Sequence, residues 1–588
     1  MQRRRFIFLL VLSLFLYLVV MLRLFYLQVL KRSYFSNLSK KNYLRVRTLY
    51  SQRGEILDRK GNKLAYDIPK YMVFLDPQKL EDRESLSKLL GGLREVFGLN
   101  IEEEVLKDKV KGFEPVPIKT LNSQEEMDRF YNNSYKLPGL FVNMVPQRFY
   151  PYGDLTAHLT GYTGYPSEDE VKKYKDRVSL QSLVGKYGVE KVFDKVLLGY
   201  IGGEEVMVNA LGKPIKVVKE KQPQKGNSVV LTIDVNIQKI IYDVFKSSGH
   251  KAGGVLVLHS NTGEVLGMLS YPSFDPNYLS EKWEALSSDP LKPLFNRCLL
   301  AKYPPASVIK PALAIALLKK GISPKEGVVC NGRFEVGNRT FYCWNRHGHG
   351  WESLKGAIRD SCDVFFYHYG YYNLGPKEIE GVLRSFGYSE DIPFELPTSK
   401  GLIPTPSWKR KKLKELWYGG DTVNLSIGQG YITSTLLEQT LMMSGIVNNG
   451  VVYKPTLVRE IIDPYGRTLW KNRKVVHKVI KASPEHFSIV KEALRDVVRR
   501  GTGQAANSPM AEIAGKTGTA QVSLSKSKNL PYNLRDHAWF VGFAPYRDPI
   551  FIVGILVEHG GSGGASAAPI ARRIIERMYM EGINREFI

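Results

Sequence analysis

The stretch YPPASVIKP, Tyr303–Pro311, places a serine and a lysine three residues apart, just before a densely apolar run. If this segment is helical, Ser307 and Lys310 lie one turn apart on the same face. A serine hydroxyl becomes a nucleophile when a base removes its proton, and a lysine can be that base when burial or nearby cations lower its pKa. The alternative is a helix cap followed by a solvated lysine, because this spacing is common by chance.

Two later stretches complete a pattern that the first one cannot establish alone. RDSCDVFFYHYG, Arg359–Gly370, places Ser361 and Asp363 at the start of an aromatic helix, and IAGKTGTAQ, Ile513–Gln521, places Lys516 on a strand. Serine-x-x-lysine, serine-x-amide-or-acid and lysine-threonine-glycine, in this order, are the signature of serine acyl-transferases that react with penicillin. The three signals together predict acyl transfer through a serine ester.

The N-terminus predicts a membrane anchor. Three arginines within Met1–Arg5 precede seventeen apolar or weakly polar residues, Phe6–Leu22, near the lower limit for crossing about 30 Å of hydrocarbon. A cleaved signal peptide is the alternative, but no small-x-small cleavage site follows. We expect a cytoplasmic tail at 1–5, a single transmembrane helix at 6–30, and the remainder outside the cytoplasmic membrane.

The composition allows several domains and limits the partners. At 588 residues, roughly three to four domain-sized units are expected. The formal net charge of +25 is compatible with nucleic acid, an anionic membrane surface or an acidic polymer as partner. No Lys/Arg-rich block is interleaved with aromatic residues, so we expect no nucleic-acid role.

The first half of the chain reads as an extended stalk. Residues 31–225 are polar, strand-like and turn-rich, and RGEILDRKGNKLA, Arg53–Ala65, predicts a strand, a turn and a second strand. Residues 83–110 switch to helical periodicity. The sequence of this half shows no compact cluster of His, Cys and acidic residues, which argues against a second active site there.

The composition changes near residue 226 and predicts an α+β domain at 226–588. A helix is expected to begin at Asp234, and Ala252–Ser270 reads as two strands around an Asn-Thr-Gly turn. Lys310–Leu318 has the density of apolar residues expected of a central helix. Three successive strands near the C-terminus and a helix from Ala567 to about Tyr579 complete the domain.

With these motifs quoted, the chain resembles the class B penicillin-binding proteins, which are peptidoglycan D,D-transpeptidases. The resemblance covers essentially the whole chain and includes RFYPYGDLTAHLTGYTG, TIDVNIQ, GEVLGMLSYPSFDPN, NLSIGQGYITSTLLEQ and FVGFAP. It implies a serine β-lactamase-like transpeptidase domain at 226–588 with a five-stranded antiparallel sheet. It also implies an elongated, mainly β dimerisation or pedestal domain at 31–225, with a helical head insertion near 83–145.

The resemblance implies a role for each motif residue. Ser307 attacks the penultimate D-Ala of a donor stem peptide, Lys310 takes its proton, and Ser361 with Lys516 protonates the leaving amine. Asp363 hydrogen-bonds the substrate amide or positions Lys310. The substrate carboxylate is expected at Thr517 and Thr519, and Gly518 is expected to let the substrate backbone approach the strand closely. The amides of Ser307 and Thr519 are expected to form the oxyanion hole. Acyl transfer of this kind requires no cofactor.

Asp363 stands where the family usually has asparagine. This substitution, together with Gly348–Gly350 and HGGSGGASAAP near the C-terminus, makes the chain most similar to the penicillin-binding protein 2 group, which acts in cell elongation. A carboxylate cannot donate a hydrogen bond unless it is protonated, so the expected contact with the substrate amide is less secure at Asp363.

A cluster of thiols and an imidazole lies between the first two motifs in sequence: Cys330, Cys343, His349 and Cys362. Three thiolates and one imidazole suit tetrahedral zinc, and some members of the resembled group have zinc near the catalytic cleft. A disulfide and a buried free thiol are the alternatives outside the membrane. His347 is a competing ligand, and Cys298 reads as a lone core thiol.

The resemblance also implies partners and leaves alternative functions. The expected partners are peptidoglycan stem peptides, the membrane, a RodA-type polymerase and an MreC-type protein of the rod complex. A D,D-carboxypeptidase, which releases D-Ala by hydrolysis, is the alternative enzyme. A β-lactam receptor or scaffold without turnover is the alternative of a different class.

Overall fold

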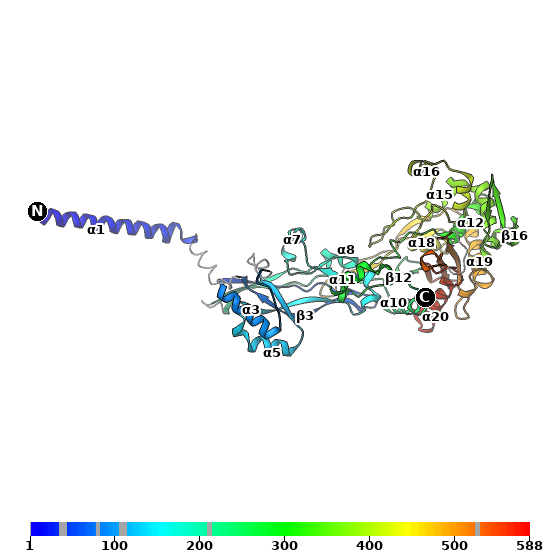
Figure 1. Cartoon of the computed structure of the whole chain (residues 1–588). Coiled ribbons are helices and arrows are strands. Elements are labelled where there is room, and N and C mark those ends of the chain that lie inside the picture. The colour runs from blue at the N-terminus through cyan, green and yellow to red at the C-terminus, as the bar shows by residue number, and fades with distance from the viewer. Residues whose placement is uncertain are drawn as a thin grey trace.

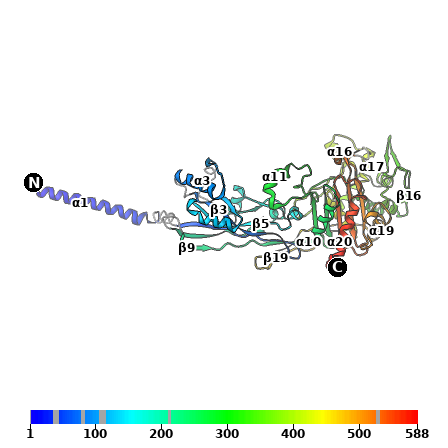
Figure 2. The ribbon, with the colours of Figure 1, turned by 60° about the horizontal axis from the view of Figure 1, so that its bottom comes forward.

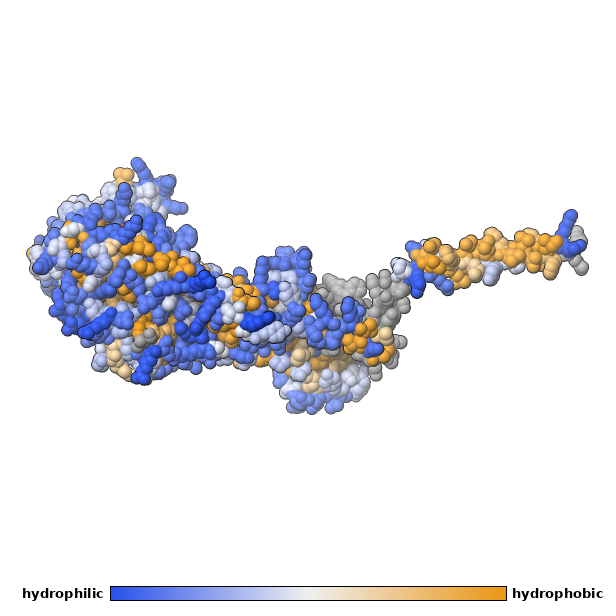
Figure 3. Space-filling model, turned by 180° about the vertical axis from the view of Figure 1, so that it is seen from behind, coloured by the Kyte–Doolittle hydropathy of each residue, from blue (hydrophilic) through white to orange (hydrophobic). Residues whose placement is uncertain are grey.

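The molecule is long, with a single helix at one end and a rounded body at the other (Figure 1). The computed structural model describes residues 2–34, 44–77, 83–104, 115–208, 214–523 and 530–587. Helix α1 (Gln2–Phe25) continues into a π-helical turn, η1 (Tyr26–Leu30). The segment Arg3–Leu30 is long and apolar enough to cross a membrane and is 0% buried in its most apolar window. Figure 3 shows its apolar surface standing clear of the rest of the molecule.

The middle of the molecule is made of sheets. A three-stranded antiparallel sheet has the order β1-β8-β9, and a seven-stranded sheet has the order β19-β18-β10-β2-β3-β4, with β5 paired to β3. The predicted hairpin at 53–65 is confirmed, because β2 and β3 are joined by a turn in which Asp58 Oδ1 accepts the backbone N–H groups of Lys60 and Asn62 at 2.8 Å. The strands are β1 (Leu44–Leu49), β2 (Ile56–Leu57), β3 (Lys63–Leu75), β4 (Val116–Leu121), β5 (Leu140–Phe149), β8 (Gly202–Val208) and β9 (Pro214–Lys221).

The seven-stranded sheet takes strands from both sides of residue 226. Strand β10 (Ser228–Leu231) pairs in parallel with β2 and antiparallel with β18 (Val458–Ile462), which is followed by β19 (Thr468–Lys471). The expected division at 225/226 therefore comes just before β10, in a sheet that contains strands from both sides of the division. The pedestal and the rounded body are joined by backbone pairing and not by a flexible linker.

The head of the pedestal combines helices with the ends of β3, β4 and β5. Helices α3 (Arg83–Phe97) and α5 (Gln124–Asn132) cover these strands, and Leu89, Leu93 and Phe130 are buried in a shared apolar cluster. The predicted helical segment 83–110 is confirmed for α3, while residues 105–110 lie outside the described part of the chain.

The rounded body is built on a five-stranded antiparallel sheet of order β12-β11-β23-β22-β21. The two strands predicted around the Asn-Thr-Gly turn and the three predicted near the C-terminus are all present, which confirms the predicted α+β class. Their bounds are β11 (Gly253–His259), β12 (Val265–Tyr271), β21 (Ala514–Ala520), β22 (His537–Ala544) and β23 (Phe551–Val557).

Helices cover both faces of this sheet. Helices α10 (Val235–Ser247) and α20 (Ala567–Met580) pack together on one face, as Figure 2 shows. The side chains of Ile570, Ile574 and Met578, four residues apart, form the buried stripe of α20. The start of α10 agrees with the prediction, because the Asp234 carboxylate accepts the N–H of Asn236 at 2.8 Å as an N-cap.

The opposite face carries α12 (Lys310–Lys319), α18 (Leu436–Val447) and α19 (Pro484–Arg500). The predicted central helix is α12, and all its residues from Lys310 to Leu318 are buried. The remaining elements used below are η7 (Ala306–Ile309), β13 (Gly327–Cys330), β16 (Gly350–Ser353), α14 (Asp363–Tyr369), α15 (Gly375–Ser385), α16 (Pro406–Lys412) and α17 (Gly419–Leu425); the pedestal also contains α8 (Gly188–Val192) and α9 (Asp194–Leu197).

Candidate active site

Ser307 lies in the 3-10 turn η7, immediately before α12. The residue before it, Ala306, has φ +50° and donates its backbone N–H to the carbonyl of Gly428 at 2.9 Å. A non-glycine residue in this left-handed region is strained, and such strain is common at active sites. The turn leaves Ser307 half-buried, while Lys310, one turn later, is fully buried.

Lys310 connects the first motif to the second. Its Nζ donates to Asp363 Oδ1 at 2.7 Å and to the backbone carbonyl of Ser361 at 2.9 Å, and it lies 3.5 Å from Ser361 Oγ. Ser361 is itself strained, with φ +55°, in the tight connection that precedes α14. The structure therefore brings Lys310, Ser361 and Asp363 into direct contact.

Lys516 completes the group from β21, the edge strand of the five-stranded sheet. Its Nζ donates to Ser361 Oγ at 2.9 Å and to the Thr517 carbonyl at 3.0 Å. Burial lowers the pKa of Lys516 well below its usual value, and the nearby charge of Lys310 lowers it further, while Asp363 acts in the opposite direction. Two lysines from different motifs thus meet at one serine hydroxyl, an arrangement suited to proton transfer.

Gly518 allows β21 to lie against the turn that carries Ser307. A Cβ atom at Gly518 would come within 2.8 Å of Val308 Cγ2 and 3.3 Å of the Pro305 carbonyl oxygen. The segment that approaches Gly518 closely in this structure is therefore η7. Any larger residue would push Ser307 away from the strand.

The two threonines of β21 have different surroundings. Thr517 is buried, and its hydroxyl lies 2.7 Å from the hydroxyl of Thr502. Thr519 is exposed, its hydroxyl accepts the N–H of Gly563 at 3.3 Å, and its carbonyl accepts from Gln429 Nε2 at 3.0 Å. Thr502 was not among the residues expected from sequence; a threonine between two glycines directly after a long helix was the available signal.

Both oxygens of Asp363 are occupied by the protein. Oδ2 accepts the backbone N–H of Trp344 at 3.0 Å, while Oδ1 binds Lys310. The backbone N–H of Asp363 donates to Cys343 Sγ at 3.4 Å. Of the two roles expected for Asp363, these contacts favour positioning Lys310. They also connect the second motif to the cysteine cluster.

Cys330, Cys343, His349 and Cys362 come together as one group. One possible ligand atom from each lies within 4.8 Å of the others, and both Cys330 Sγ and Cys343 Sγ lie 3.6 Å from His349 Nδ1. Tetrahedral zinc with sulfur and nitrogen ligands requires about 3.5 to 3.8 Å between neighbouring ligand atoms. The donor set and the two sulfur–nitrogen distances of 3.6 Å therefore fit zinc.

The cluster is arranged by its own hydrogen bonds and by its neighbours. Hydrogen bonding with Cys362 lowers the pKa of Cys343 to about 3, and hydrogen bonding to Cys343 raises the pKa of His349 to about 9. The competing ligand His347 is exposed and lies outside the group, and the cysteines are free thiols. Cys298 is buried apart from the group, with its Sγ 3.0 Å from the Leu269 carbonyl.

A group of contacts around the segment that precedes Ser307 was also not expected from sequence. The Tyr303 hydroxyl donates to Glu558 Oε1 at 2.6 Å, and Arg297 Nε lies 3.0 Å from Glu558 Oε2, with side chains only 3% and 11% exposed. Trp539 Nε1 donates to the Pro304 carbonyl at 3.1 Å. These contacts fix the chain that leads into Ser307, but no sequence pattern connects residues this far apart.

Comparison with known proteins gives matches over nearly the whole chain. The penicillin binding protein transpeptidase domain matches residues 253–576, and the penicillin-binding protein dimerisation domain matches residues 48–231. The peptidoglycan D,D-transpeptidase MrdA of Haemophilus influenzae is 34% identical over 91% of this chain and 85% of its own.

Two solved structures have similar folds. The complex between penicillin-binding protein PBP2 and MreC from Helicobacter pylori contains a chain with a TM-score of 0.80 and 28% identity, covering 92% of this chain and 100% of its own. A structure described as the structural coordination of polymerization and crosslinking by a peptidoglycan synthase complex has a TM-score of 0.71 and 27% identity, covering 97% of both chains.

Proposed function

This chain belongs to the class B penicillin-binding proteins and acts as a peptidoglycan D,D-transpeptidase of cell elongation, and we propose that Ser307 is its nucleophile. The observation that carries this assignment is the meeting of Lys310 and Lys516 at Ser361 Oγ, directly beside the turn that holds Ser307. A fluorescent penicillin should label the full chain and fail to label Ser307→Ala. Ser287→Ala, at an exposed serine of another helix, is the matched control and should label normally.

The contacts support a role for each of the other polar groups. Ser307 Oγ attacks the carbonyl carbon of the penultimate D-Ala, and its proton passes to Lys310. The C–N bond to the terminal D-Ala breaks, Ser361 and Lys516 deliver a proton to the leaving amine, and an ester on Ser307 remains. Thr517 and Thr519 hold the terminal carboxylate, with Thr502 bound to Thr517.

The oxyanion of the tetrahedral intermediate would be stabilised by the backbone N–H groups of Ser307 and Thr519. Ser307 lies in η7 and Thr519 on β21, and these two segments pack against each other at Gly518. Loss of one oxyanion-hole donor typically costs about 3 to 4 kcal/mol of transition-state stabilisation.

The second half of the reaction separates the transpeptidase from the alternative carboxypeptidase. In the transpeptidase, an amine of a neighbouring stem peptide attacks the ester on Ser307 and forms the cross-link. Incubation with uncross-linked peptidoglycan, a competent acceptor and the cognate polymerase should give cross-linked dimers. Trimmed monomers alone under these conditions would contradict the assignment.

Arg3–Leu30 is the proposed transmembrane anchor, with its N-terminus in the cytoplasm because arginines precede the apolar run. Residues 31–225 form the proposed pedestal and 226–588 the transpeptidase domain, which would lie outside the cytoplasmic membrane. Protease added to intact spheroplasts should then degrade the body, while a tag placed before residue 1 should be protected.

Two partners are supported by the structural matches. The similarity to a PBP2 chain bound to MreC and to a chain of a peptidoglycan synthase complex supports an MreC-type partner and a RodA-type polymerase. We place the polymerase contact at the transmembrane helix and pedestal. Co-purification of the full chain with each partner, compared with a chain lacking Arg3–Leu30, would test this placement.

The thiol and imidazole group is the proposed structural zinc site. Cys330, Cys343, Cys362 and Nδ1 of His349 would hold the ion, which would supply rigidity and not reactivity. Because Cys362 lies between Ser361 and Asp363, the ion would fix the second motif. Purified protein should contain about one zinc per chain, with loss in Cys330→Ser and retention in the control Cys298→Ser. Zinc-free wild-type protein would contradict the assignment.

A further inference from the structure

A group of four cations projects from the rounded body at α16. Arg410, Lys411, Lys412 and Lys414 are all exposed, and in the described part of the chain none of them forms an ion pair. We call these four residues the cationic ridge. Figures 1 and 2 both place α16 at the upper edge of the body, to one side of the long axis of the molecule.

The ridge is held in place by buried contacts beneath it. Thr405 caps α16 by accepting the N–H of Trp408 at 3.1 Å. Lys409, with a side chain only 5% exposed, binds Asp421 at 2.8 Å and Glu415 at 3.4 Å. Lys409 thus engages the two neighbouring carboxylates, and among the described residues none of the four outward cations forms an ion pair.

A short series of contacts connects the ridge to the active site. The ring of Trp408 packs on the ring of Tyr431 with centroids 5.5 Å apart. Tyr431 ends the loop that begins at Gly428, whose carbonyl accepts the N–H of Ala306. In the same loop, Gln429 Nε2 donates to the carbonyl of Thr519. Three residues of chain span at most about 10 Å, so Tyr431, which contacts Trp408 of α16, lies within this distance of Gly428, which is bonded to the turn that holds Ser307.

Two exposed aromatic side chains lie beside the ridge. Tyr418 is 63% exposed and Tyr431 is 41% exposed, and both rings lie within 6 Å of Lys409 Nζ, at 5.3 and 5.8 Å from the ring centroids. An array of cations beside exposed aromatic rings fits a ligand that combines negative charge with flat, weakly polar faces. A glycan strand whose stem peptides carry free carboxylates has this chemistry, and under the proposed function its stem peptides must reach Ser307.

We propose that the cationic ridge, with Tyr418 and Tyr431, is a subsite that binds the anionic glycopeptide strand of uncross-linked peptidoglycan and guides its stem peptides to Ser307. This proposal rests on the proposed function, because it extends the substrate contact beyond the residues that surround Ser307. The four unpaired cations would attract the strand over a distance set by the ionic strength.

The test compares strand binding with acylation in the full chain. The variant replaces Arg410, Lys411, Lys412 and Lys414 with glutamine. The control makes the same change at four residues exposed on β19 or beside β20 (Val476–Val479): Lys471, Arg473, Lys474 and Lys481. Binding of soluble uncross-linked glycan strands is measured at low and high salt, and the rate of labelling by fluorescent penicillin is measured in parallel. A second variant exchanges lysine and arginine at the four ridge positions and so keeps the charge.

The ridge variant should bind strands about tenfold more weakly at low salt, since each exposed charge pair contributes roughly 0.2 to 1 kcal/mol. Its binding should no longer depend on salt, and its penicillin labelling should remain normal. The control and the charge-keeping variant should bind as the wild type does. Equal strand binding by the ridge variant would overturn the proposal, even if binding to vesicles of anionic lipid were lost. Failure of wild-type labelling would instead overturn the proposed function.

Discussion

The carboxylate of Asp363 affects the charge of the lysines around Ser361. Burial lowers the pKa of Lys516, the ammonium of Lys310 lowers it further, and Asp363 partly opposes both effects. A lysine whose pKa is lowered loses its proton at a lower pH than usual and can then accept one. Asp363 stands where the family usually has asparagine. Its negative charge therefore raises the pH at which Lys516 becomes neutral.

Replacing Asp363 with asparagine should shift the pH dependence of acylation. Removing the negative charge lowers the pKa of Lys516, so Lys516 loses at a lower pH the proton that it delivers to the leaving amine, and the alkaline limb of the acylation rate should move to lower pH. The maximal rate should fall, by no more than about a hundredfold, because Lys310 loses its ion pair. The measurement is the rate of penicillin labelling from pH 5 to 9.

Asp391→Asn is the control for this shift. Asp391 is 91% exposed and, among the described residues, its ion pair is with the exposed Lys400, so its replacement should leave the pH profile unchanged. An alkaline limb that stays in place in Asp363→Asn, or that moves to higher pH, would contradict the described electrostatics.

The packing of β21 against η7 depends on a missing side chain. Because a Cβ at Gly518 would lie 2.8 Å from Val308 Cγ2, Gly518→Ala should push η7 away from the strand while leaving the strand itself able to form. A displacement of about 1 Å in a catalytic group can reduce the rate about a hundredfold. We expect acylation by penicillin to fall to this extent, with a smaller loss of thermal stability.

Gly381→Ala in α15 gives a matched control. No atom lies within 4 Å of a Cβ at Gly381, and alanine stabilises a helix by about 1 kcal/mol relative to glycine. This variant should acylate normally and unfold at the same or a higher temperature. Equal acylation rates in the two variants would show that η7 can move without loss of activity.

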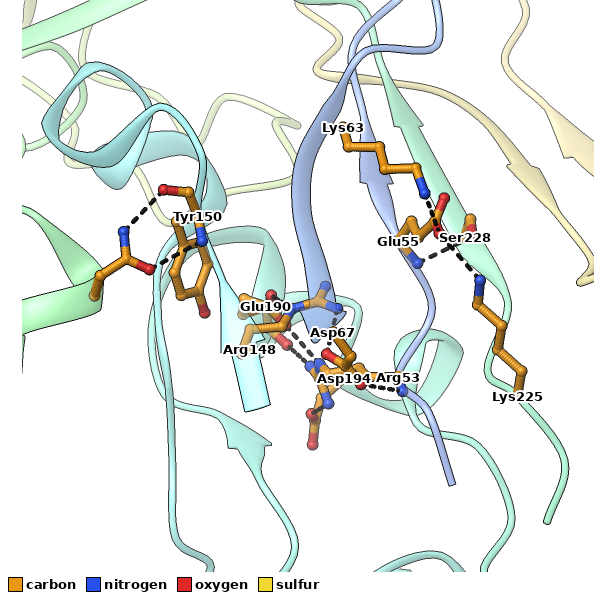
Figure 4. Close-up of polar contacts among 11 residues, drawn as sticks. Arg53, Glu55, Lys63, Asp67, Arg148, Tyr150, Glu190, Asp194, Lys225 and Ser228 are labelled. Atoms are coloured by element: carbon orange, nitrogen blue, oxygen red, sulfur yellow. Dashed lines mark hydrogen bonds and ion pairs between the residues drawn. The ribbon is translucent and has the colours of Figure 1, made fainter. Parts of the chain in front are cut away.

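The strands of the pedestal are joined by a buried group of charges, shown in Figure 4. Glu190, from α8, is fully buried and binds Arg53 Nε and Arg148 Nε, each at 2.6 Å. Arg53 also binds Asp194 at 2.7 Å, and Arg148 binds Asp67 at 3.0 Å. Burial alone would raise the pKa of Glu190, but the charges of Arg148 and Arg53 lower it below its usual value of 4.5.

Glu190→Gln should destabilise the pedestal. The change leaves two buried arginines short of negative charge, and breaking a buried ion pair in this way costs about 3 to 5 kcal/mol. Because the pKa of Glu190 is lowered on folding, its stabilising contribution is present above pH 4.5 and is lost as the pH falls further. Thermal unfolding should show a large loss at pH 7 and a smaller difference from wild type at pH 3.

The control is Glu170→Gln, whose partner Lys186 is partly exposed, with side chains 29% and 30% accessible. A pair of this kind contributes no more than about 1 kcal/mol. If both variants unfold at the same temperature, the buried network does not stabilise the pedestal.

Over the whole molecule, the features that could be predicted from the sequence are those that depend on residues close together in the chain. Ser307 and Lys310 are three residues apart, and strands such as β11 and β12 are separated by one turn, so local patterns were sufficient. Contacts between distant segments were not predictable. Tyr303 and Glu558 are 255 residues apart in sequence, and β18 joins a pedestal sheet more than 200 residues from β10. Such pairs are chosen by burial and shape, which leave no motif.

Anchor and body are structurally separate, which predicts the effect of removing the anchor. None of the most apolar window of Arg3–Leu30 is buried against the rest of the chain, so deleting residues 1–30 should not disturb the active site. The truncated protein should acylate with penicillin at the wild-type rate. It should also leave the membrane fraction, whereas the full chain should require detergent for extraction.

The net charge of +25 adds a condition to this result. A basic body can remain on anionic lipid through its surface charges alone, but 1 M salt reduces the screening length to about 3 Å and should release it. The full chain, held by an apolar helix, should resist the same wash. If the truncated protein stayed on membranes in high salt, the body itself would hold an apolar membrane contact, and Arg3–Leu30 would not be the only anchor.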